Sequence, residues 1–175
     1  MIAIRTLLTL TLLLGVAYPL AVTGLAQLLF PWQANGSLLT NAKQQVVGSA
    51  LLAQKFERAD YFHSRPSASD FATIGGGASN LGMSSPLRAE FAAAAARAQP
   101  EARVPALLTR SASGLDPHLP LAAALAQVKR VAEQRGLDPV QLTEQVKSAA
   151  QAGILGPQVV NILQLNLQLD HQKGA

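Results

Sequence analysis

The sequence predicts an α+β protein with one N-terminal transmembrane helix, followed by a single soluble domain of about three helices and a small sheet. Charged residues make up only 14 % of the 175 residues, against about 25 % in typical soluble domains, so part of the chain suits lipid. Residues 6–30 carry no charge and are rich in Leu, Val and Ala. Beyond them, proline and glycine signals that start and end helices alternate with short apolar runs, which is typical of a mixed domain.

Composition also excludes several classes of function. Lys and Arg exceed Asp and Glu only by 14 to 10, and no basic run is present that could follow a phosphate backbone, so we expect no nucleic-acid partner. The absence of cysteine excludes disulfides, thiolate metal ligands and a cysteine nucleophile.

Residues 6–30 are predicted to form an uncleaved membrane anchor in the lipid bilayer. About 20 helical residues cross the hydrocarbon core of a bilayer, so this span is long enough with some tilt. The alternative is a cleaved signal, but apolar regions of signal peptides are shorter, about 7–15 residues, and Ala21-Val22-Thr23 is a poor cleavage site. Pro19 removes one backbone hydrogen bond and is expected to kink the helix.

The orientation of the anchor follows from its flanking charges. Arg5 precedes the span, and the next charged residue, Lys43, lies well beyond it. The positive-inside rule therefore predicts that residues 1–5 are cytoplasmic and that the soluble domain lies outside the cytoplasm.

The rest of the chain divides into a connection at 31–45, a soluble domain at 46–170 and a polar tail at 171–175. Pro31 and Asn35-Gly36-Ser37 are turn signals in the connection. Within the domain we predict strands at 46–53 and 104–109, loops around 61–71 and 75–80, and helices at 87–98, 120–135 and from 139 to Gly153. Pro86 and Pro120 start two of these helices, Gly136 ends the second, and Asp138 caps the third, with Pro139 at its first position and Gln141 three residues after the cap.

A last strand is predicted near the C-terminus. Leucines at 163, 165, 167 and 169 alternate with Gln, Asn, Gln and Asp. A period of two is typical of a half-buried strand with leucines on one face and amides on the other.

The segment YFHSRPSASDF at 61–71 contains the residue types of a serine hydrolase triad. A nucleophilic serine, Ser64 or Ser67, would need His63 or His118 within hydrogen-bond reach and a third group to orient that base. No G-x-S-x-G or S-x-x-K motif accompanies these residues. Ser, Asp and Arg are also common loop residues because they bond to nearby backbone, and the sequence favours this structural reading.

Two further patterns predict neither a nucleotide-binding site nor a metal site. The triplet Gly75-Gly76-Gly77 lacks the Gly-Lys pair of a P-loop and the flanking elements of a dinucleotide fingerprint, so it indicates a turn. The three histidines are far apart in sequence, and Asp116-Pro117-His118 is the only acid–histidine neighbourhood, so we expect no metal site.

Several blocks together resemble one family. They are PLAVTGLAQLLFPWQANGSLL, GSALLAQKF, YFHSRPSASDF, GGGASNLG, SASGLDPHLPLAAALAQVKRVA and ILGPQVVNILQLNLQLD. In this order and spacing, across roughly residues 5–170, they resemble the C subunit of the Kdp potassium-transporting P-type ATPase, the KdpC family.

The resemblance implies an obligatory, non-catalytic subunit of a potassium import complex in the bacterial inner membrane. Its partners would be a channel-like subunit that binds potassium, the P-type ATPase subunit and a small single-helix subunit. The family is described as a catalytic chaperone that raises the ATP affinity of the pump subunit, so ATP would associate with this chain only together with that subunit, and no covalent cofactor is expected.

The resemblance also implies candidate interface residues. In the quoted blocks they are Trp32, Asn35, Gly36, Tyr61, Phe62, Arg65, Pro66, Ser67, Ser79, Asn80, Asp116, Pro117, His118 and Asn166. No catalytic or metal-binding residue is expected among them. A periplasmic soluble domain cannot touch cytosolic ATP, so its effect would be allosteric. A free-standing membrane-anchored periplasmic binding module is the alternative function, and a membrane-tethered serine hydrolase is a third.

Overall fold

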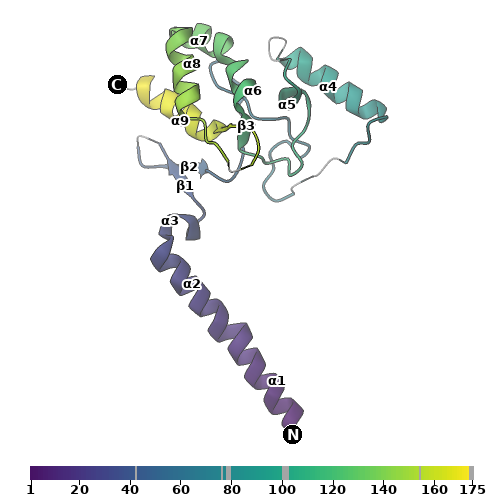
Figure 1. Cartoon of the computed structure of the whole chain (residues 1–175), viewed down its shortest axis with the longest axis vertical. Coiled ribbons are helices and arrows are strands. Elements are labelled where there is room, and N and C mark those ends of the chain that lie inside the picture. The colour runs from purple at the N-terminus through teal and green to yellow at the C-terminus, as the bar shows by residue number, and fades with distance from the viewer. Residues whose placement is uncertain (42, 76, 78–79, 100–102, 154, 174–175) are drawn as a thin grey trace. The chain divides into compact units, whose positions relative to one another are not determined.

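The computed structural model describes residues 1–41, 43–75, 77, 80–99, 103–153 and 155–173. Figure 1 shows the course of the chain. It forms two compact units, Met1–Leu38 and Leu39–Ala175, and each is described by itself.

The first unit is dominated by one apolar helix, Ile2–Leu29, which is long and apolar enough to cross a membrane. It consists of α1 (Ile2–Leu12), a π-helical turn η1 (Leu13–Ala17) and α2 (Tyr18–Leu29). Pro19 has no N–H, and its ring crowds the carbonyl of Gly15 four residues earlier. We attribute the π-helical turn to this crowding, since a wider turn is one way in which a helix absorbs a misplaced backbone bond.

The residues after the apolar helix form a short turn of helix, α3 (Pro31–Ala34). The Asn35 amide donates to Pro31 O at 2.6 Å, and Gly36 ends the turn at φ +84°, in the left-handed region. The Trp32 indole N–H donates to Leu38 O at 3.1 Å. The predicted turn at 35–37 is therefore present, and three of the candidate residues stabilise it.

The second unit holds two small antiparallel pairs of strands and six described helices. The first sheet pairs β1 (Leu38–Thr40) with β2 (Val46–Ser49), and the second pairs β3 (His118–Pro120) with β4 (Val159–Asn161). The helices are α4 (Pro86–Ala98), α5 (Pro105–Leu108), α6 (Leu121–Leu125), α7 (Val128–Arg135), α8 (Pro139–Ser148) and α9 (Ile162–Lys173). The predicted α+β class is confirmed.

The core lies where α6–α9 meet the β3–β4 pair (Figure 1). The strands align Leu119 with Val160, and both side chains are fully buried. Phe62 is also fully buried in this core although it belongs to no regular element. The other buried members of the core are Leu107, Ala123, Ala124, Val128, Val131, Ala132, Leu142, Val146, Ile162, Leu165 and Leu169.

The predicted strand at 163–169 is wrong: these residues belong to helix α9. The same segment also has the spacing of a helix. Its buried residues Ile162, Leu165, Asn166 and Leu169 recur every three or four positions. Leu and Gln are also good helix formers, whereas β-branched residues are needed to favour a strand. The strand occurs just before, at Val159–Asn161, where two valines stand.

Four other boundaries differ from the prediction. The third helix ends at Ser148 and not at Gly153, because Gln151 pairs with Val159 in an isolated antiparallel bridge. The segment 104–109 is not a strand but contains helix α5, because Pro105 fixes the φ of a first helical position. The predicted helix 120–135 is divided into α6 and α7 around Ala126 and Gln127. The strand predicted at 46–53 ends at Ser49, whose hydroxyl accepts from Leu51 N–H at 3.1 Å and turns the chain.

The predicted helix starts at Pro86 and Pro139 and the predicted helix end at Gly136 are confirmed. Helix α4 begins at Pro86, and Gly136 ends α7 in the left-handed conformation at φ +65°. Asp138 caps α8, since its carboxylate accepts from Val140 N–H at 3.1 Å.

Candidate functional site

The candidate residues at 61–71 belong to an extended segment that has no strand partner. Two side-chain amides take the place of one. Asn166 of α9 accepts from Phe62 N–H and donates to Phe62 O, both at 2.9 Å. Gln127 accepts from His63 N–H at 2.8 Å and donates to His63 O at 3.0 Å. Because buried backbone groups need partners, these two amides allow the segment to cross the core without a neighbouring strand.

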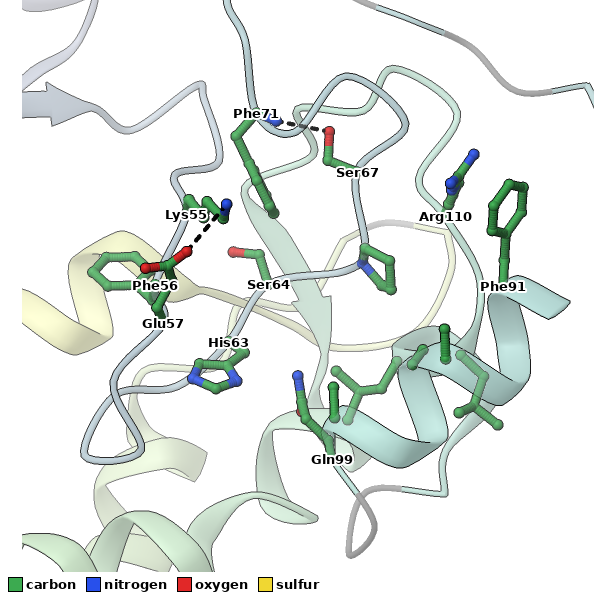
Figure 2. Close-up of a pocket in the computed structure, with 16 residues that line it drawn as sticks. Lys55, Phe56, Glu57, His63, Ser64, Ser67, Phe71, Phe91, Gln99 and Arg110 are labelled. Carbon is green, nitrogen blue, oxygen red and sulfur yellow. Dashed lines mark hydrogen bonds and ion pairs between the residues drawn. The ribbon is translucent and has the colours of Figure 1, made fainter.

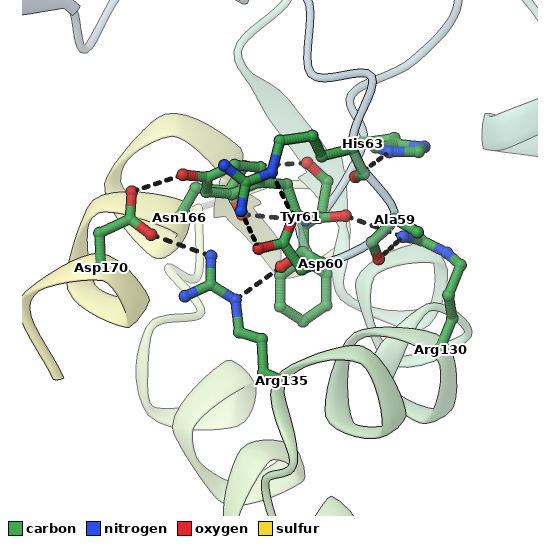
Figure 3. A network of polar contacts seen from close by, with 10 residues as sticks. Ala59, Asp60, Tyr61, His63, Arg130, Arg135, Asn166 and Asp170 are labelled. Carbon is green, nitrogen blue, oxygen red and sulfur yellow. Dashed lines mark hydrogen bonds and ion pairs between the residues drawn. The ribbon is translucent and has the colours of Figure 1, made fainter. Parts of the chain in front are cut away.

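Two arginines of α7 hold the backbone just before this point (Figure 3). Arg130 donates to Tyr61 O at 3.0 Å and also to Ala59 O. Arg135 donates to Asp60 O at 2.6 Å and to the Asp170 carboxylate at 3.0 Å. Both arginines therefore contact consecutive carbonyls of one loop, and Arg135 also links that loop to α9.

Tyr61 completes this network. Its hydroxyl donates to Asp170 Oδ2 at 2.9 Å, and the Arg135 guanidinium lies 4.9 Å from the centre of its ring. Burial, and next the hydrogen bond to the Asp170 carboxylate, raise the pKa of Tyr61 above its ordinary value of 10.0. The hydrogen bond from Arg58 lowers the pKa of Asp60 below its ordinary value of 3.8. Both shifts therefore reflect how the loop is held: Tyr61 is shifted first by its burial and then by a contact, and Asp60 first by a contact.

Arg65 and Pro66 join the segment to the loop before β3. Arg65 Nη2 donates to Arg110 O at 3.0 Å and to Thr109 Oγ1 at 3.3 Å, and its other terminal nitrogen lies 3.8 Å from the Asp116 carboxylate. Pro66 O accepts from Ser111 N–H at 3.1 Å. Arg65 thus bonds to one carbonyl and one hydroxyl and lies near one carboxylate, all within the same chain.

Ser67 stabilises a turn. Its hydroxyl oxygen accepts from Ser69 N–H at 3.2 Å and from Phe71 N–H at 3.0 Å. Asp70 and Phe71 both have positive φ, 50° and 62°, a conformation that non-glycine residues adopt only when neighbours hold it. The Asp70 carboxylate forms an ion pair with Lys55 at 3.0 Å. This geometry is that of a stabilised loop.

The triad hypothesis fails on geometry. Neither Ser64 nor Ser67 is hydrogen-bonded to a histidine: Ser67 bonds within its turn, and Ser64 Oγ is buried without a hydrogen-bond partner. His63 Nε2 lies 3.0 Å from Arg58 O. A serine nucleophile needs its base within hydrogen-bond reach, and neither Ser64 nor Ser67 has one.

Asp116, Pro117 and His118 form the turn into β3. The Asp116 carboxylate accepts from His118 N–H at 3.0 Å, and Pro117 O accepts from Ile162 N–H at 3.1 Å. The His118 ring lies 4.0 Å from the same carboxylate. Within the described ranges, no three His, Asp or Glu side chains converge in a way that could hold a metal ion.

The remaining candidates have no described contact in this network. Trp32, Asn35 and Gly36 belong to the first unit. Asn80 lies in the loop before α4, and Ser79 lies outside the described residues.

Sequence reasoning missed four residues of the network: Gln127, Arg130, Arg135 and Asp170. The available signal was weak, because arginines and amides on a helix are ordinarily assigned to its solvated face.

These features define a class of protein: one helix that is a candidate membrane span, followed by a compact α+β unit whose polar side chains stabilise its own loops. Comparison with known proteins identifies the particular family. The family model described as KdpC, K+-transporting ATPase, c chain, matches residues 1–171. The chain therefore belongs to the KdpC family.

Named relatives agree with the family match. A protein of Pseudomonas aeruginosa named potassium-transporting ATPase KdpC subunit is 54 % identical over 172 residues, which cover 95 % of this chain and 93 % of the relative. Proteins with the same name from Pseudomonas putida and Pseudomonas syringae pv. tomato are 49 % and 47 % identical. The matches cover 96 % and 99 % of this chain, and 93 % of each relative.

Proposed function

We propose that this chain is a non-catalytic accessory subunit of a high-affinity, ATP-driven potassium import complex. In that complex it supports assembly and acts as a catalytic chaperone that raises the ATP affinity of the pump subunit. The match to the KdpC family over residues 1–171 carries the proposal. The proposed partners are the potassium-binding channel-like subunit, the P-type ATPase subunit, the small single-helix subunit and the lipid bilayer. Any association of the complex with ATP is through the pump subunit.

The geometry of segment 61–71 supports a structural role. The side chains that first suggested catalysis are used to hold backbone: Ser67 stabilises a turn and Arg65 contacts the loop at 109–116. A nucleophile of a hydrolase would instead be paired with a base. This arrangement favours an accessory subunit over a serine hydrolase.

The proposed location is the bacterial inner membrane, with residues 1–5 in the cytoplasm and the second unit in the periplasm. Arg5 is the only charged side chain before Lys43, which supports this orientation through the positive-inside rule. In this orientation the second unit cannot contact cytosolic ATP, so its effect on ATP affinity is allosteric and passes through the membrane-spanning parts of the complex.

Topology is the first test, because it limits every mechanism. The chain has no cysteine, so Ser113→Cys introduces a single thiol at an exposed position, and Ala3→Cys is the cytoplasmic control. We expect a membrane-impermeant thiol reagent to label Ser113→Cys in intact cells and Ala3→Cys only after lysis. The reverse result would place the second unit in the cytoplasm and contradict an indirect mechanism.

The chaperone role is tested by the ATP affinity of the pump subunit in the complex, measured with and without the purified chain. We expect the dissociation constant for ATP to fall when the chain is added. An unchanged constant in a complex that contains the chain would contradict this role.

The alternative is a free-standing periplasmic binding module, which a cavity of about 540 Å³ in the second unit favours (Figure 2). It predicts that the tagged chain purifies from membranes alone, whereas the accessory-subunit proposal predicts that large membrane subunits purify with it.

A further inference from the structure

A small pocket lies where helix α4 meets the end of α5 and the two residues that follow it. Its volume is about 140 Å³, and it is lined by Leu81, Arg88, Phe91, Leu108, Thr109 and Arg110. That volume is below the range of about 300–1,000 Å³ that is typical of sites for whole small molecules. The pocket therefore suits one compact group of a ligand.

Arg110 is fixed at one side of this pocket. Figure 2 shows it beside Phe91 of α4, and its guanidinium lies 3.4 Å from the centre of that ring. Its backbone is held as well, because Arg110 O accepts from Arg65 Nη2 at 3.0 Å. An arginine that stacks on an aromatic face keeps the N–H groups at the edges of its plane available. The ring therefore positions the Arg110 guanidinium without using its hydrogen-bond donors.

Arg88 brings a second guanidinium to the same pocket. Among the described residues, its side chain bonds to the sulfur of Met83 and to no oxygen. A thioether is a weak acceptor, whereas a guanidinium has five N–H donors. Arg88 also lies in the first turn of α4, where a positive charge opposes the helix dipole, so its position does not serve the stability of that helix. Both arginines therefore have donors that an anion can use.

The charges around the pocket leave it positive. No carboxylate of the described residues forms an ion pair with either arginine. The ion-paired group of Lys55, Glu57 and Asp70 carries one net negative charge and does not line this pocket. If that group is counted together with the two arginines, one net positive charge still remains. Glu90 and Arg97, the other charged residues of α4, also lie outside the lining and offset each other.

We propose that this pocket binds a phosphate group. Arg88 and Arg110 each donate to its oxygens, and Leu81, Phe91 and Leu108 contact the apolar part of the molecule that carries it. Guanidinium groups match phosphate with paired N–H donors and stay charged at any physiological pH. A carboxylate has two oxygens, which one guanidinium already occupies, whereas a phosphate group has oxygens for both. The two sources of this chemistry are a free phosphate ester and a phospholipid headgroup.

Titration of glycerol phosphate with the full chain in a non-ionic detergent tests the proposal, with phosphorus NMR as the readout. We expect saturable binding at one site. Binding should weaken as sodium chloride is added, because salt screens the attraction between the phosphate group and the two arginines. No saturable binding at millimolar concentration, or binding that does not respond to salt, would overturn the proposal.

Variants locate the binding at the two arginines. Arg88→Gln should weaken binding about tenfold, because a charge-assisted hydrogen bond is lost. It should not lower the thermal midpoint of the empty chain, since among the described residues the Arg88 side chain bonds only to a thioether. Arg110→Gln should weaken binding at least as much. Arg97→Gln makes the same charge change on α4 outside the lining and should leave binding unchanged. Equal losses in Arg88→Gln and Arg97→Gln, or unchanged binding in Arg88→Gln, would refute the assignment.

A lipid probe separates the two sources. Dihexanoyl phosphatidic acid has the headgroup of glycerol phosphate and adds two short acyl chains, which can bury apolar surface. Binding of the lipid about tenfold tighter than glycerol phosphate, with the same loss in Arg88→Gln, would support a phospholipid headgroup. Equal affinity of the two probes, or lipid binding that Arg88→Gln does not weaken, would support a free phosphate ester. This inference goes beyond the proposed function, and its measurements need no potassium pump, so its failure is distinct from failure of the accessory role.

Discussion

Replacing Asn166 by alanine is the most direct perturbation of the segment that crosses the core. Asn166 is 1 % exposed and makes both hydrogen bonds to the Phe62 backbone, each at 2.9 Å. Asn166→Ala leaves one N–H and one C=O buried without a partner. Each such group costs about 1–3 kcal/mol, so we expect a loss of about 2–4 kcal/mol in the free energy of unfolding, since some relaxation will recover part of the cost.

The assay is urea unfolding of the full chain in detergent, followed by far-ultraviolet circular dichroism. Gln168→Ala is the matched control, because Gln168 is an exposed amide on the same helix, and it should change stability by no more than about 0.5 kcal/mol. If Asn166→Ala were as stable as Gln168→Ala, the side-chain amide would not be what holds the segment, and the account of segment 61–71 would be wrong.

Three further predictions concern the same loops. Arg65→Ala should reduce co-purification of the other pump subunits, because it frees the loop that Arg65 holds through Arg110 O. His63→Ala should spare most transport. Loss of ATPase turnover in an assembled His63→Ala complex would contradict the structural role of this segment. Asp60 has a lowered pKa in the folded chain, so its contribution to stability is present above the unfolded pKa and is lost as pH falls through the folded pKa. Asp60→Asn should therefore reduce the fall of the thermal unfolding midpoint between pH 6 and pH 2. Gly114→Ala should lower the free energy of unfolding more than Gly136→Ala. Both glycines have positive φ, but only at Gly114 would an added Cβ meet other atoms, Ser69 Oγ at 3.1 Å among them. Equal losses of stability in the two variants would show that this crowding is unimportant.

The parts of the fold that could be predicted from sequence are those set by local chemistry. Pro86, Gly136 and Asp138 act through their own backbone or the adjacent turn, so they give the same signal in any fold. The uncharged run at 6–30 is equally local, because its length and composition alone identify a candidate membrane span.

The errors arose where tertiary packing decides. Leucines at 163, 165, 167 and 169 satisfy a period of two, but only contact with the core shows that Ile162, Leu165 and Leu169 form the buried face of a helix. The division between α6 and α7 at Gln127 is of the same kind. That amide is fully buried because it binds the backbone of His63, 64 residues away in sequence, and no window of local sequence shows such a partner.

The candidate site was predicted in part for a related reason. Segment 61–71 could be recognised as a distinctive block, and its polar residues as loop formers, from composition alone. Which groups hold it could not be recognised: Arg130, Arg135 and Asp170 act from α7 and α9 across long sequence separations. Family resemblance identifies such positions only as a block and assigns no role to single side chains.

The proposed chaperone role makes a final, thermodynamic prediction. If binding of this chain raises the ATP affinity of the pump subunit by some factor, ATP must raise the affinity of the remaining complex for this chain by the same factor, because coupling between two binding equilibria is reciprocal. Couplings of this kind are typically about 5–150-fold. We therefore expect a non-hydrolysable ATP analogue to tighten binding of the labelled chain to a complex that lacks it, by the factor seen for ATP affinity. The measurement is a fluorescence anisotropy titration in detergent, with and without the analogue. A tightening of ATP binding without a matching tightening of chain binding would mean that the two effects are not equilibrium coupling, and the chain would then act on a kinetic step of the pump cycle.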